Sequence, residues 1–317
     1  MRTRRLGTTD LELTSIGLGT WAIGGPWEYG WGPQDDADSI RAIHAALDAG
    51  VNWIDTAPAY GCGHAEEVIG RALRERGETP ILATKCGLSW DEQRRKVNCL
   101  DGDAIRAEAD ASLRRLGVDV IDLWQLHWPV PDEQLEEAWE AMAEVRRQGK
   151  VRYLGASNFT VEQLRRVARI DPPVALQPPY SLIQRQAEGA LFDYCRENHL
   201  GIVCYSPMYK GLLTGKYDAA RVEALAPDDH RRRDPNFQGQ RLKKNLAMIE
   251  RLRPLAAARG HSLAQLALAW VLRRPEVTAA IVGARNEKQA RETVQAGDWM
   301  LDDETIEQID AILAELG

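Results

Sequence analysis

Residues 38–55 read DSIRAIHAALDAGVNWID, in which a helical segment leads directly into a short apolar strand. Apolar residues recur on one side of a helix over 38–49, and Gly50 ends that helix. The run 51–55 is apolar at most positions, which is typical of a strand that is buried on both faces. A helix followed at once by a buried strand is the repeating unit of α/β folds with a parallel sheet.

The same alternation recurs along the whole chain. Strands are expected at 15–20, 51–55, 80–85, 120–127, 151–156, 174–177, 201–205 and 278–282. Helices are expected at 38–49, 65–76, 103–116, 132–147, 161–168, 188–198, 242–259, 263–273, 287–295 and 303–316. Every strand is followed by at least one helix, and the composition does not change along the chain. The pattern therefore predicts one α/β domain over 1–317, a (β/α)8 TIM barrel.

A doubly wound parallel sheet is the alternative fold. Such a sheet usually carries a G-x-G-x-x-G turn after its first strand. Here 17–21 reads GLGTW, which lacks the third glycine, so the barrel is favoured. The residues beyond the eight units are assigned to an N-terminal β-hairpin, a long loop over 208–240 and extra C-terminal helices.

Composition excludes several classes of function. The chain has 317 residues, of which 44% are hydrophobic and 27% are charged, as is usual for a globular protein. Its 40 basic and 47 acidic residues give a net charge of −7, which argues against a nucleic-acid partner. No apolar run is long enough for a membrane span, and no secretory signal follows Met1. The five cysteines are scattered and without a CxxC pair, so we expect reduced thiols, a cytoplasmic protein and no metal site.

Polar residues stand where three neighbouring strands end. The second strand ends in Asp55 and leads to Tyr60, the third ends in Lys85, and the fourth ends in His127. Barrel enzymes place catalytic groups at these carboxyl ends, so the four side chains are expected to converge on one rim. A lysine at the end of an apolar strand needs a partner, and Asp55 on the adjacent strand is available.

This combination suggests acid–base chemistry. An ammonium near the Tyr60 hydroxyl favours the phenolate and lowers the tyrosine pKa from about 10, which suits a general acid near neutral pH. His127 is placed to orient a carbonyl oxygen by a hydrogen bond. A structural ion pair beside a structural histidine is the alternative, but four converging groups favour a catalytic site.

The residues at these positions resemble those of the aldo-keto reductases. The similarity runs from Leu6 to the last helix. Its markers are GLGTW at 17–21, DTAPAYG at 55–61, EEVIG at 66–70, ATK at 83–85, SLRRLG at 112–117, LHWP at 126–129, GASNF at 155–159, Gln177, YSP at 205–207, GLLTGK at 211–216 and GAR at 283–285. The branch that it resembles most includes bacterial general-stress reductases and potassium-channel β subunits.

The resemblance implies NADPH-dependent reduction of aldehydes or ketones. It implies a catalytic tetrad of Asp55, Tyr60, Lys85 and His127. Tyr60 would donate the proton to the carbonyl oxygen, and Lys85 with Asp55 would depress its pKa. His127 would orient the carbonyl of the small-molecule substrate.

The resemblance also implies the residues that bind NADPH or NADP+. They are Ser157, Asn158, Gln177, Tyr205, Ser206, Met208, Gly211, Lys216, Gly283, Arg285, Gln289 and Glu292. The first three would bind the nicotinamide carboxamide, and Tyr205 would stack on its ring. We expect Arg285 to bind the 2′-phosphate, because a guanidinium matches phosphate geometry, and this favours NADP over NAD. Thr293 departs from the asparagine that family members often carry beside the adenine.

Tryptophans are expected around the substrate. Trp21 and Trp128 stand where the family builds an apolar substrate pocket. Trp27, Trp31 and Trp90 lie on nearby loops and either join this pocket or pack within the loops.

Three further expectations complete the sequence analysis. The basic run 231–233 is flanked by aspartates and is expected on a solvated loop face. A nicotinamide-binding regulatory subunit that senses redox state is the alternative function, and a barrel isomerase or lyase is a weaker one. No membrane partner is expected for the enzyme, which would be a monomer or a small homo-oligomer.

Overall fold

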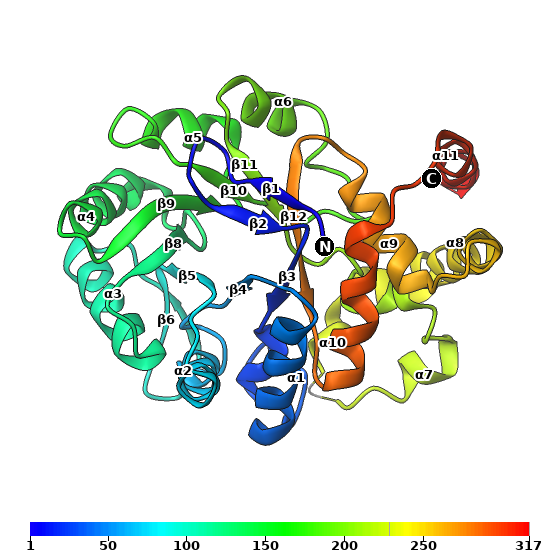
Figure 1. Cartoon of the computed structure of the whole chain (residues 1–317), viewed down its shortest axis with the longest axis horizontal. Helices are drawn as coiled ribbons and strands as arrows, with labels where there is room; N and C mark the ends of the chain where they lie inside the picture. Colours follow the sequence, from blue (N-terminus) through cyan, green and yellow to red (C-terminus); the bar gives the residue numbers. More distant parts are fainter. Residues whose placement is uncertain (228, 317) are drawn as a thin grey trace.

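Eight parallel strands close into a barrel in the computed structural model, which describes residues 1–227 and 229–316 (Figure 1). The strands are β3 (Ile16–Gly19), β4 (Trp53–Asp55), β5 (Ile81–Cys86), β8 (Ile121–Leu126), β9 (Val151–Ser157), β10 (Ala175–Gln177), β11 (Gly201–Cys204) and β12 (Val277–Gly283). They follow one another around the barrel in chain order, and β12 pairs with β3 to close the ring. The predicted TIM barrel is confirmed.

Helices surround the barrel on its outside (Figure 1). They are α1 (Asp36–Asp48), α2 (His64–Arg76), α3 (Gly102–Leu116), α4 (Leu135–Arg147), α5 (Val161–Val167), α6 (Ala190–Glu197), α7 (Ala219–Glu223), α8 (Gly239–Ala258), α9 (Leu263–Leu272), α10 (Glu287–Val294) and α11 (Asp303–Leu316). All ten predicted helices are present, with ends that differ by a few residues. The five-residue helix α7 lies in the stretch that was predicted as a long loop.

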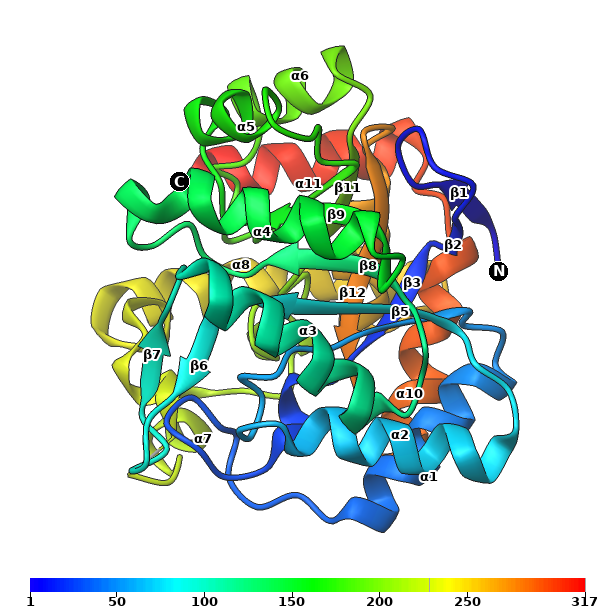
Figure 2. The ribbon, with the colours of Figure 1, turned by 90° about the vertical axis from the view of Figure 1, so that its left-hand side faces the viewer.

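Two hairpins lie at opposite ends of the barrel (Figure 2). The predicted N-terminal hairpin pairs β1 (Thr3–Arg5) with β2 (Glu12–Thr14). The other pairs β6 (Leu88–Trp90) with β7 (Lys96–Asn98), in a region where the sequence predicted only a loop. The three-residue strands of this second hairpin are too short for an alternating pattern to show.

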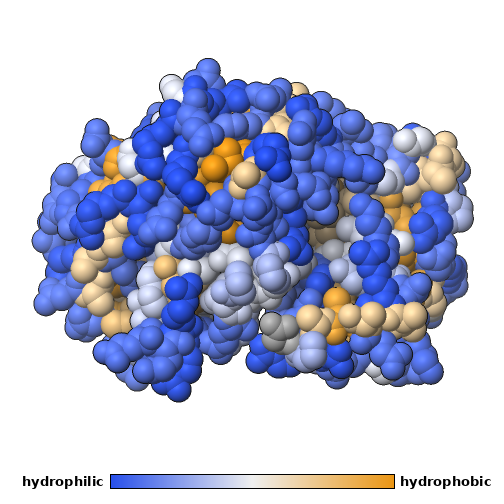
Figure 3. All heavy atoms as spheres, turned by 90° about the horizontal axis from the view of Figure 1, so that it is seen from below, coloured by the Kyte–Doolittle hydropathy of each residue, from blue (hydrophilic) through white to orange (hydrophobic). Residues whose placement is uncertain are grey.

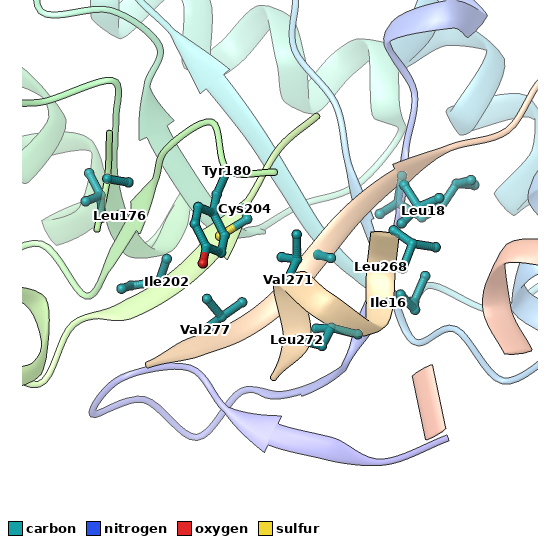
Figure 4. Packing of buried hydrophobic residues seen from close by; sticks show 14 of the residues in the cluster. Ile16, Leu18, Leu176, Tyr180, Ile202, Cys204, Leu268, Val271, Leu272 and Val277 are labelled. Carbon is teal, nitrogen blue, oxygen red and sulfur yellow. The ribbon is translucent and has the colours of Figure 1, made fainter. Parts of the chain in front are cut away.

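Apolar side chains fill the barrel and the layer between strands and helices. Inside the barrel, Leu6 and Leu13 of the N-terminal hairpin segment cluster with Trp53 and Leu123 of the strands. Outside it, every residue of α9 is buried. Figure 4 shows Leu268 of this helix near Ile16 and Leu18 of β3. Because the hairpin occupies one end of the barrel, a ligand has access from the other end.

The outer surface is mainly hydrophilic. In Figure 3, hydrophobic residues form separate small groups on a face that is otherwise covered by hydrophilic ones. Among the described residues, no helix combines the length and the apolar character that crossing a bilayer would require.

Candidate active site

The four predicted catalytic residues come together at the carboxyl end of the barrel. Asp55 is the last residue of β4, and Lys85 lies near the end of the adjacent strand β5. His127 directly follows β8, the next strand around the barrel. Tyr60 lies on the loop that leads from β4 to α2. The parallel register of three neighbouring strands therefore places all four at one rim, as predicted.

Lys85 is fully buried and makes three short contacts. Its ammonium Nζ donates to Asp55 Oδ1 at 2.7 Å, to the carbonyl oxygen of Thr56 at 2.9 Å and to the Tyr60 hydroxyl oxygen at 3.3 Å. An ammonium has three donors and no acceptor, so this set of partners is complete. The Tyr60 O–H cannot donate back to Lys85 and is left to donate elsewhere.

The acidity of Tyr60 differs from the sequence prediction. Burial raises the pKa of the Tyr60 phenol well above its ordinary value, and the Asp55 carboxylate raises it further. Burial also lowers the pKa of Lys85, although Asp55 acts in the opposite direction. The prediction that Lys85 and Asp55 depress the Tyr60 pKa is therefore wrong for this structure, because burial of the phenol and the negative charge of Asp55 both raise it.

His127 is held by its backbone and has a side chain without a partner. Its N–H donates to the carbonyl oxygen of Cys86, and its own carbonyl oxygen accepts from Asn158 Nδ2 at 3.0 Å. Its imidazole Nδ1 is buried and forms no hydrogen bond with the described residues. Burial, with Lys85 and Lys96 nearby, lowers the pKa of His127 well below its ordinary value. The ring is therefore neutral at neutral pH.

Two amides hold the second oxygen of Asp55. Gln177 Nε2 donates to Asp55 Oδ2 at 2.8 Å, and Gln125 Nε2 approaches the same oxygen at 3.3 Å. Gln177 Nε2 also donates to Gln125 Oε1 at 3.1 Å. Gln125 is not among the residues predicted from the sequence. Its signal was a polar residue two positions before His127, near the carboxyl end of its strand.

A close backbone contact fixes the loop that carries Tyr60. Gly61 has a positive φ of 65°, and a Cβ there would lie 2.0 Å from the carbonyl oxygen of Gly24. A Cβ on Gly24 would lie 2.6 Å from the Gly61 nitrogen. The two backbones can approach this closely only because both residues lack a side chain.

Glu66, which is not among the residues predicted from the sequence, connects the elements behind the tetrad. It is completely buried on α2 and accepts from Thr84 Oγ1 and from Arg115 Nε, both at 2.6 Å. Thr84 precedes Lys85 on β5, and Arg115 belongs to α3. Glu66 thus joins two helices to the strand that carries Lys85.

The predicted nicotinamide residues form one hydrogen-bonded group. Asn158, which has a φ of 63°, accepts from the Tyr205 hydroxyl at 2.8 Å and donates to Ser157 Oγ at 3.1 Å. Ser157 Oγ donates in turn to the carbonyl oxygen of Gln177 at 3.1 Å. Ser157 and Asn158 stand at the end of β9, Gln177 ends β10 and Tyr205 follows β11, so the structure brings residues of three strands together beside His127.

The segment after β11 contains strained backbone. Ser206, Tyr209 and Lys210 all have positive φ values, of 53°, 44° and 52°. Such conformations cost roughly 1–3 kcal/mol each and tend to cluster at ligand sites. Asp234 holds the segment, because its carboxylate accepts from Lys210 Nζ at 2.7 Å and from the Tyr209 hydroxyl at 3.2 Å. Met208, one of the predicted cofactor residues, lies within this turn.

Several of the predicted cofactor residues gather at α10. Lys216 Nζ lies 3.5 Å from the Glu292 carboxylate, so these two residues pair with each other. Gln289 Oε1 accepts from the Arg285 backbone N–H at 2.9 Å. The Thr293 hydroxyl donates to the Gln289 carbonyl oxygen at 2.9 Å within the helix, where the family often has an asparagine.

A single cleft of about 850 Å³ joins these regions. The predicted residues that line it are Trp21, Asp55, Tyr60, His127, Trp128, Ser157, Asn158, Gln177, Tyr205, Ser206, Met208, Gly211, Lys216, Gly283, Arg285, Gln289 and Glu292. Lys85 lies behind the wall of the cleft. Trp27 and Trp31 also line it, whereas Trp90 stacks against the Arg115 guanidinium, 6.0 Å from the ring centroid.

The basic run after Pro227 is not a solvated face throughout, so that expectation is wrong for one residue. Arg231 is only 7% exposed and pairs with the buried Asp229 carboxylate. Its guanidinium lies 4.7 Å from the centroid of the Trp31 ring. Nothing in the sequence marks Arg231 apart from its neighbours, because the contact is made to a loop some 200 positions away.

These residues fit a nicotinamide dinucleotide. Beside Tyr60, the cleft has an imidazole with an unpartnered nitrogen at His127. Beside α10, it has the Arg285 guanidinium, whose partners are all neutral oxygens of the loop before α1. An imidazole with a free nitrogen and a guanidinium with neutral partners thus share one cleft. In the described part of the chain, no three His, Cys, Asp or Glu side chains are arranged to hold a metal ion.

Known proteins share this sequence and fold. The profile of the Aldo/keto reductase family matches residues 15–314. The aldo-keto reductase YhdN of Bacillus subtilis (strain 168) is 41% identical over 315 residues, which cover 97% of this chain and 92% of that protein. The NADH-specific methylglyoxal reductase of Escherichia coli (strain K12) is 35% identical over 311 residues, 94% of each chain. The solved structure of the glycerol dehydrogenase AKR11B4 from Gluconobacter oxydans has a TM-score of 0.90 and 40% identity, and the match covers 99% of this chain and 95% of that chain.

Proposed function

Because the chain belongs to the aldo/keto reductase family of oxidoreductases, we propose that it reduces aldehydes or ketones to alcohols with NADPH, with Tyr60 as the general acid. The observation that carries this proposal is the complete set of Lys85 partners. All three N–H donors of the Lys85 ammonium form hydrogen bonds, and the Tyr60 hydroxyl oxygen accepts the third. The phenolic proton is then free to be donated into the cleft.

Each member of the tetrad has a separate task in this mechanism. The bound cofactor would supply a hydride to the carbonyl carbon. Tyr60 gives its proton to the carbonyl oxygen, so that hydride and proton together make the alcohol. The Lys85 ammonium stabilises the phenolate that remains, and Asp55 keeps Lys85 in place. The neutral His127 ring donates a hydrogen bond that orients the carbonyl oxygen.

The raised pKa of Tyr60 is compatible with this role. A tyrosine with a high pKa stays protonated at neutral pH, which is the form that an acid needs. Its proton leaves only when negative charge develops on the carbonyl oxygen. The ammonium of Lys85 is already in contact at 3.3 Å, so no reorganisation is needed at that moment.

Arg285 supports NADPH as the preferred cofactor. The residues proposed to hold the cofactor are those predicted from the sequence, from Ser157 to Glu292. Arg285 supplies a guanidinium whose partners are neutral, which suits the additional phosphate of NADPH. Members of the family differ in this choice, since the E. coli relative is named as NADH-specific.

We propose a small aldehyde or ketone as the substrate. Trp21 and Trp128 line the cleft near Tyr60, and the ring centroid of Trp21 lies 6.4 Å from that of Tyr60. Two of the similar proteins are named for methylglyoxal and for glycerol, which are small oxygenated molecules.

The remaining proposals concern the whole chain. We propose that 1–317 is one domain that acts in the cytoplasm as a monomer or a small homo-oligomer. The family profile extends over 15–314 and supports the single domain. A regulatory subunit that senses redox state would need the same cleft, and the relatives reported above are named as enzymes, so the enzyme is favoured.

The substitution Tyr60→Phe tests the proposal. It keeps the ring and removes the acid, so turnover should fall by roughly 10²–10⁴-fold. Turnover is measured as the loss of NADPH absorbance with a panel of aldehydes and ketones. NADPH binding, measured by tryptophan fluorescence, should be unchanged.

Two outcomes would contradict the proposal in different ways. If the wild-type protein binds NADPH but none of the carbonyl compounds in the panel leads to NADPH oxidation, the reductase activity is excluded. A Tyr60→Phe protein that retains wild-type turnover would exclude Tyr60 as the acid and leave the reductase activity in place.

A further inference from the structure

Gln34 and Arg285 hold each other by two reciprocal hydrogen bonds. Arg285 Nε donates to Gln34 Oε1 at 2.8 Å, and Gln34 Nε2 donates to the Arg285 carbonyl oxygen at 2.9 Å. We call this pair the Gln34–Arg285 clasp. The Arg285 backbone N–H is also engaged, by Gln289. Both the backbone of Arg285 and the direction of its side chain are thereby fixed.

The clasp is anchored on the first helix of the barrel. Gln34 Nε2 also lies 3.1 Å from Ser39 Oγ, and Ser39 is completely buried in the first turn of α1. Helices α1 and α10 lie side by side, since β3 and β12 are neighbours in the barrel (Figure 1). The clasp therefore spans the seam where the first and the last βα units meet, at the edge of the cleft.

The guanidinium keeps its charge and part of its donor capacity. Its other acceptors are the carbonyl oxygens of Trp31, at 3.4 Å, and Pro33, at 2.5 Å. In residues 1–227 and 229–316, no carboxylate forms an ion pair with Arg285. A guanidinium has five N–H donors, and the neutral partners from the loop use three of them. Two donors and a full positive charge remain, on a residue that lines the cleft.

We propose that Gln34 is the positioning residue that sets the preference for NADPH over NADH, by orienting the Arg285 guanidinium for the 2′-phosphate. The inference rests on the proposed function, because it assumes that the cleft binds a nicotinamide dinucleotide. A free arginine loses side-chain entropy when it binds a phosphate, and the clasp removes that loss beforehand. The amide also leaves the positive charge available, which a carboxylate at the same position would not.

This arrangement links phosphate recognition to the wall of the cleft. Arg285 contacts the carbonyl oxygen of Trp31, and the Trp31 ring packs edge-on against Trp21 with 5.6 Å between ring centroids. The loop that orients the guanidinium is thus the loop that carries a tryptophan of the cleft. NADH lacks the 2′-phosphate and makes no use of the clasp.

The substitutions Gln34→Leu and Gln34→Glu test the inference. Dissociation constants for NADPH and NADH are measured by titration with tryptophan fluorescence, without any carbonyl substrate. Gln34→Leu should raise the dissociation constant of NADPH about tenfold, as expected for the loss of one hydrogen bond to a charged group. The dissociation constant of NADH should change by less than about twofold. Gln34→Glu should weaken NADPH binding further, because the new carboxylate neutralises Arg285 and repels the phosphate.

Arg233→Ala serves as the matched control. Arg233 Nη2 donates to the carbonyl oxygen of Glu28 at 3.2 Å, so this variant loosens the same loop without touching Arg285. It should change the affinities for NADPH and NADH by the same factor. Binding of 2′-AMP and 5′-AMP gives a second readout that is confined to the adenosine end, and only 2′-AMP should respond to Gln34→Leu.

The outcomes separate this inference from the proposed function. If Gln34→Leu weakens the binding of NADPH and of NADH equally, Gln34 only supports the loop and the inference is wrong. No weakening of either nucleotide would also overturn it. If Gln34→Leu weakens only the binding of NADPH but the wild type reduces no carbonyl compound, the inference about Gln34 is supported and the proposed activity is excluded. A wild type that binds neither nucleotide would overturn both.

Discussion

His127 reaches the cleft as a neutral imidazole, and its environment is the reason. Its ring lies 6.0 Å from that of Tyr60, edge-on, and its Nδ1 is buried without a partner. A charged ring at this position would have to be desolvated beside Lys85, and the pKa of His127 is lowered accordingly. The residue can therefore donate one hydrogen bond, and it carries no charge that would repel the Lys85 ammonium.

We expect His127→Gln to retain more activity than His127→Leu. The amide can still donate a hydrogen bond to the carbonyl oxygen, so kcat/KM should fall by roughly tenfold for glutamine and by about 10²–10³-fold for leucine. Steady-state kinetics with one aldehyde measure this, and NADPH binding by both variants is the control. Equal losses for the two variants would exclude hydrogen bonding as the role of His127.

The pH dependence gives an independent check on the same residue. Because burial places the pKa of His127 well below 6.5, protonation of this ring should not reduce kcat/KM as the pH falls through about 6.5. A wild-type profile with an acidic limb near that pH that disappears in His127→Gln would contradict a neutral His127.

At the scale of elements, the strand β5 is tied to the helices that cover it. Glu66 of α2 accepts from Thr84, the residue before Lys85, and from Arg115 of α3. At the end of the same strand, Glu108 of α3 accepts from the Gly87 backbone N–H at 3.0 Å. The position of Lys85 therefore depends on the packing of two helices as well as on its own strand.

Glu108 makes this junction sensitive to pH. Burial raises the pKa of its carboxyl from 4.5 to about 7, so the folded protein holds a proton that the unfolded chain releases. The contribution of Glu108 to stability is then fully present below pH 4.5 and is lost as the pH rises through about 7. The loss amounts to at most about 3 kcal/mol.

We expect Glu108→Gln to gain stability relative to the wild type as the pH is raised from about 5 to about 8. The amide keeps an acceptor for Gly87 and has no charge to bury, so the difference in the free energy of unfolding should grow by up to about 3 kcal/mol in favour of the variant. Urea unfolding of both proteins across this pH range measures it. A difference that stays constant with pH would show that Glu108 does not titrate with a raised pKa.

At the scale of the whole molecule, the buried hairpin residues and the cleft lie at opposite ends of the barrel. The N-terminal hairpin occupies one end (Figure 2). Leu6 and Leu13 of this segment are buried against residues of the barrel strands. The cleft lies at the carboxyl end of the strands. This separation is typical of TIM barrels, in which conserved function and fold stability use different faces.

We expect Leu13→Ala to destabilise the protein with little effect on catalysis. Leu13 is 1% exposed, and loss of a buried leucine costs roughly 2–5 kcal/mol through lost transfer energy and a residual cavity. The free energy of unfolding and kcat/KM at a temperature below the transition are the two measurements. Val120→Ala is the control, since Val120 is 41% exposed and its loss should cost less than about 0.5 kcal/mol. A large fall in kcat/KM for folded Leu13→Ala would show that the two ends are coupled.

The cleft itself is closed by segments far apart in the chain. His230 Nδ1 lies 3.2 Å from the carbonyl oxygen of Gly30, and Arg231 stacks on the Trp31 ring. Arg285 holds the same loop from the side of α10. Each of these contacts joins parts of the sequence that are more than 190 positions apart, or about 250 in the case of Arg285.

The sequence by itself determined the barrel and the rim on which the polar residues of three strands meet. Strand and helix periodicity are local, and parallel neighbours put Asp55, Lys85 and His127 on one rim whatever the loops do. Tertiary structure alone decided the acidity of Tyr60, because the desolvation that raises its pKa depends on every group packed around the phenol. It also decided the partners of Arg285 and Arg231, since loop conformation depends on contacts between distant segments that no local pattern encodes.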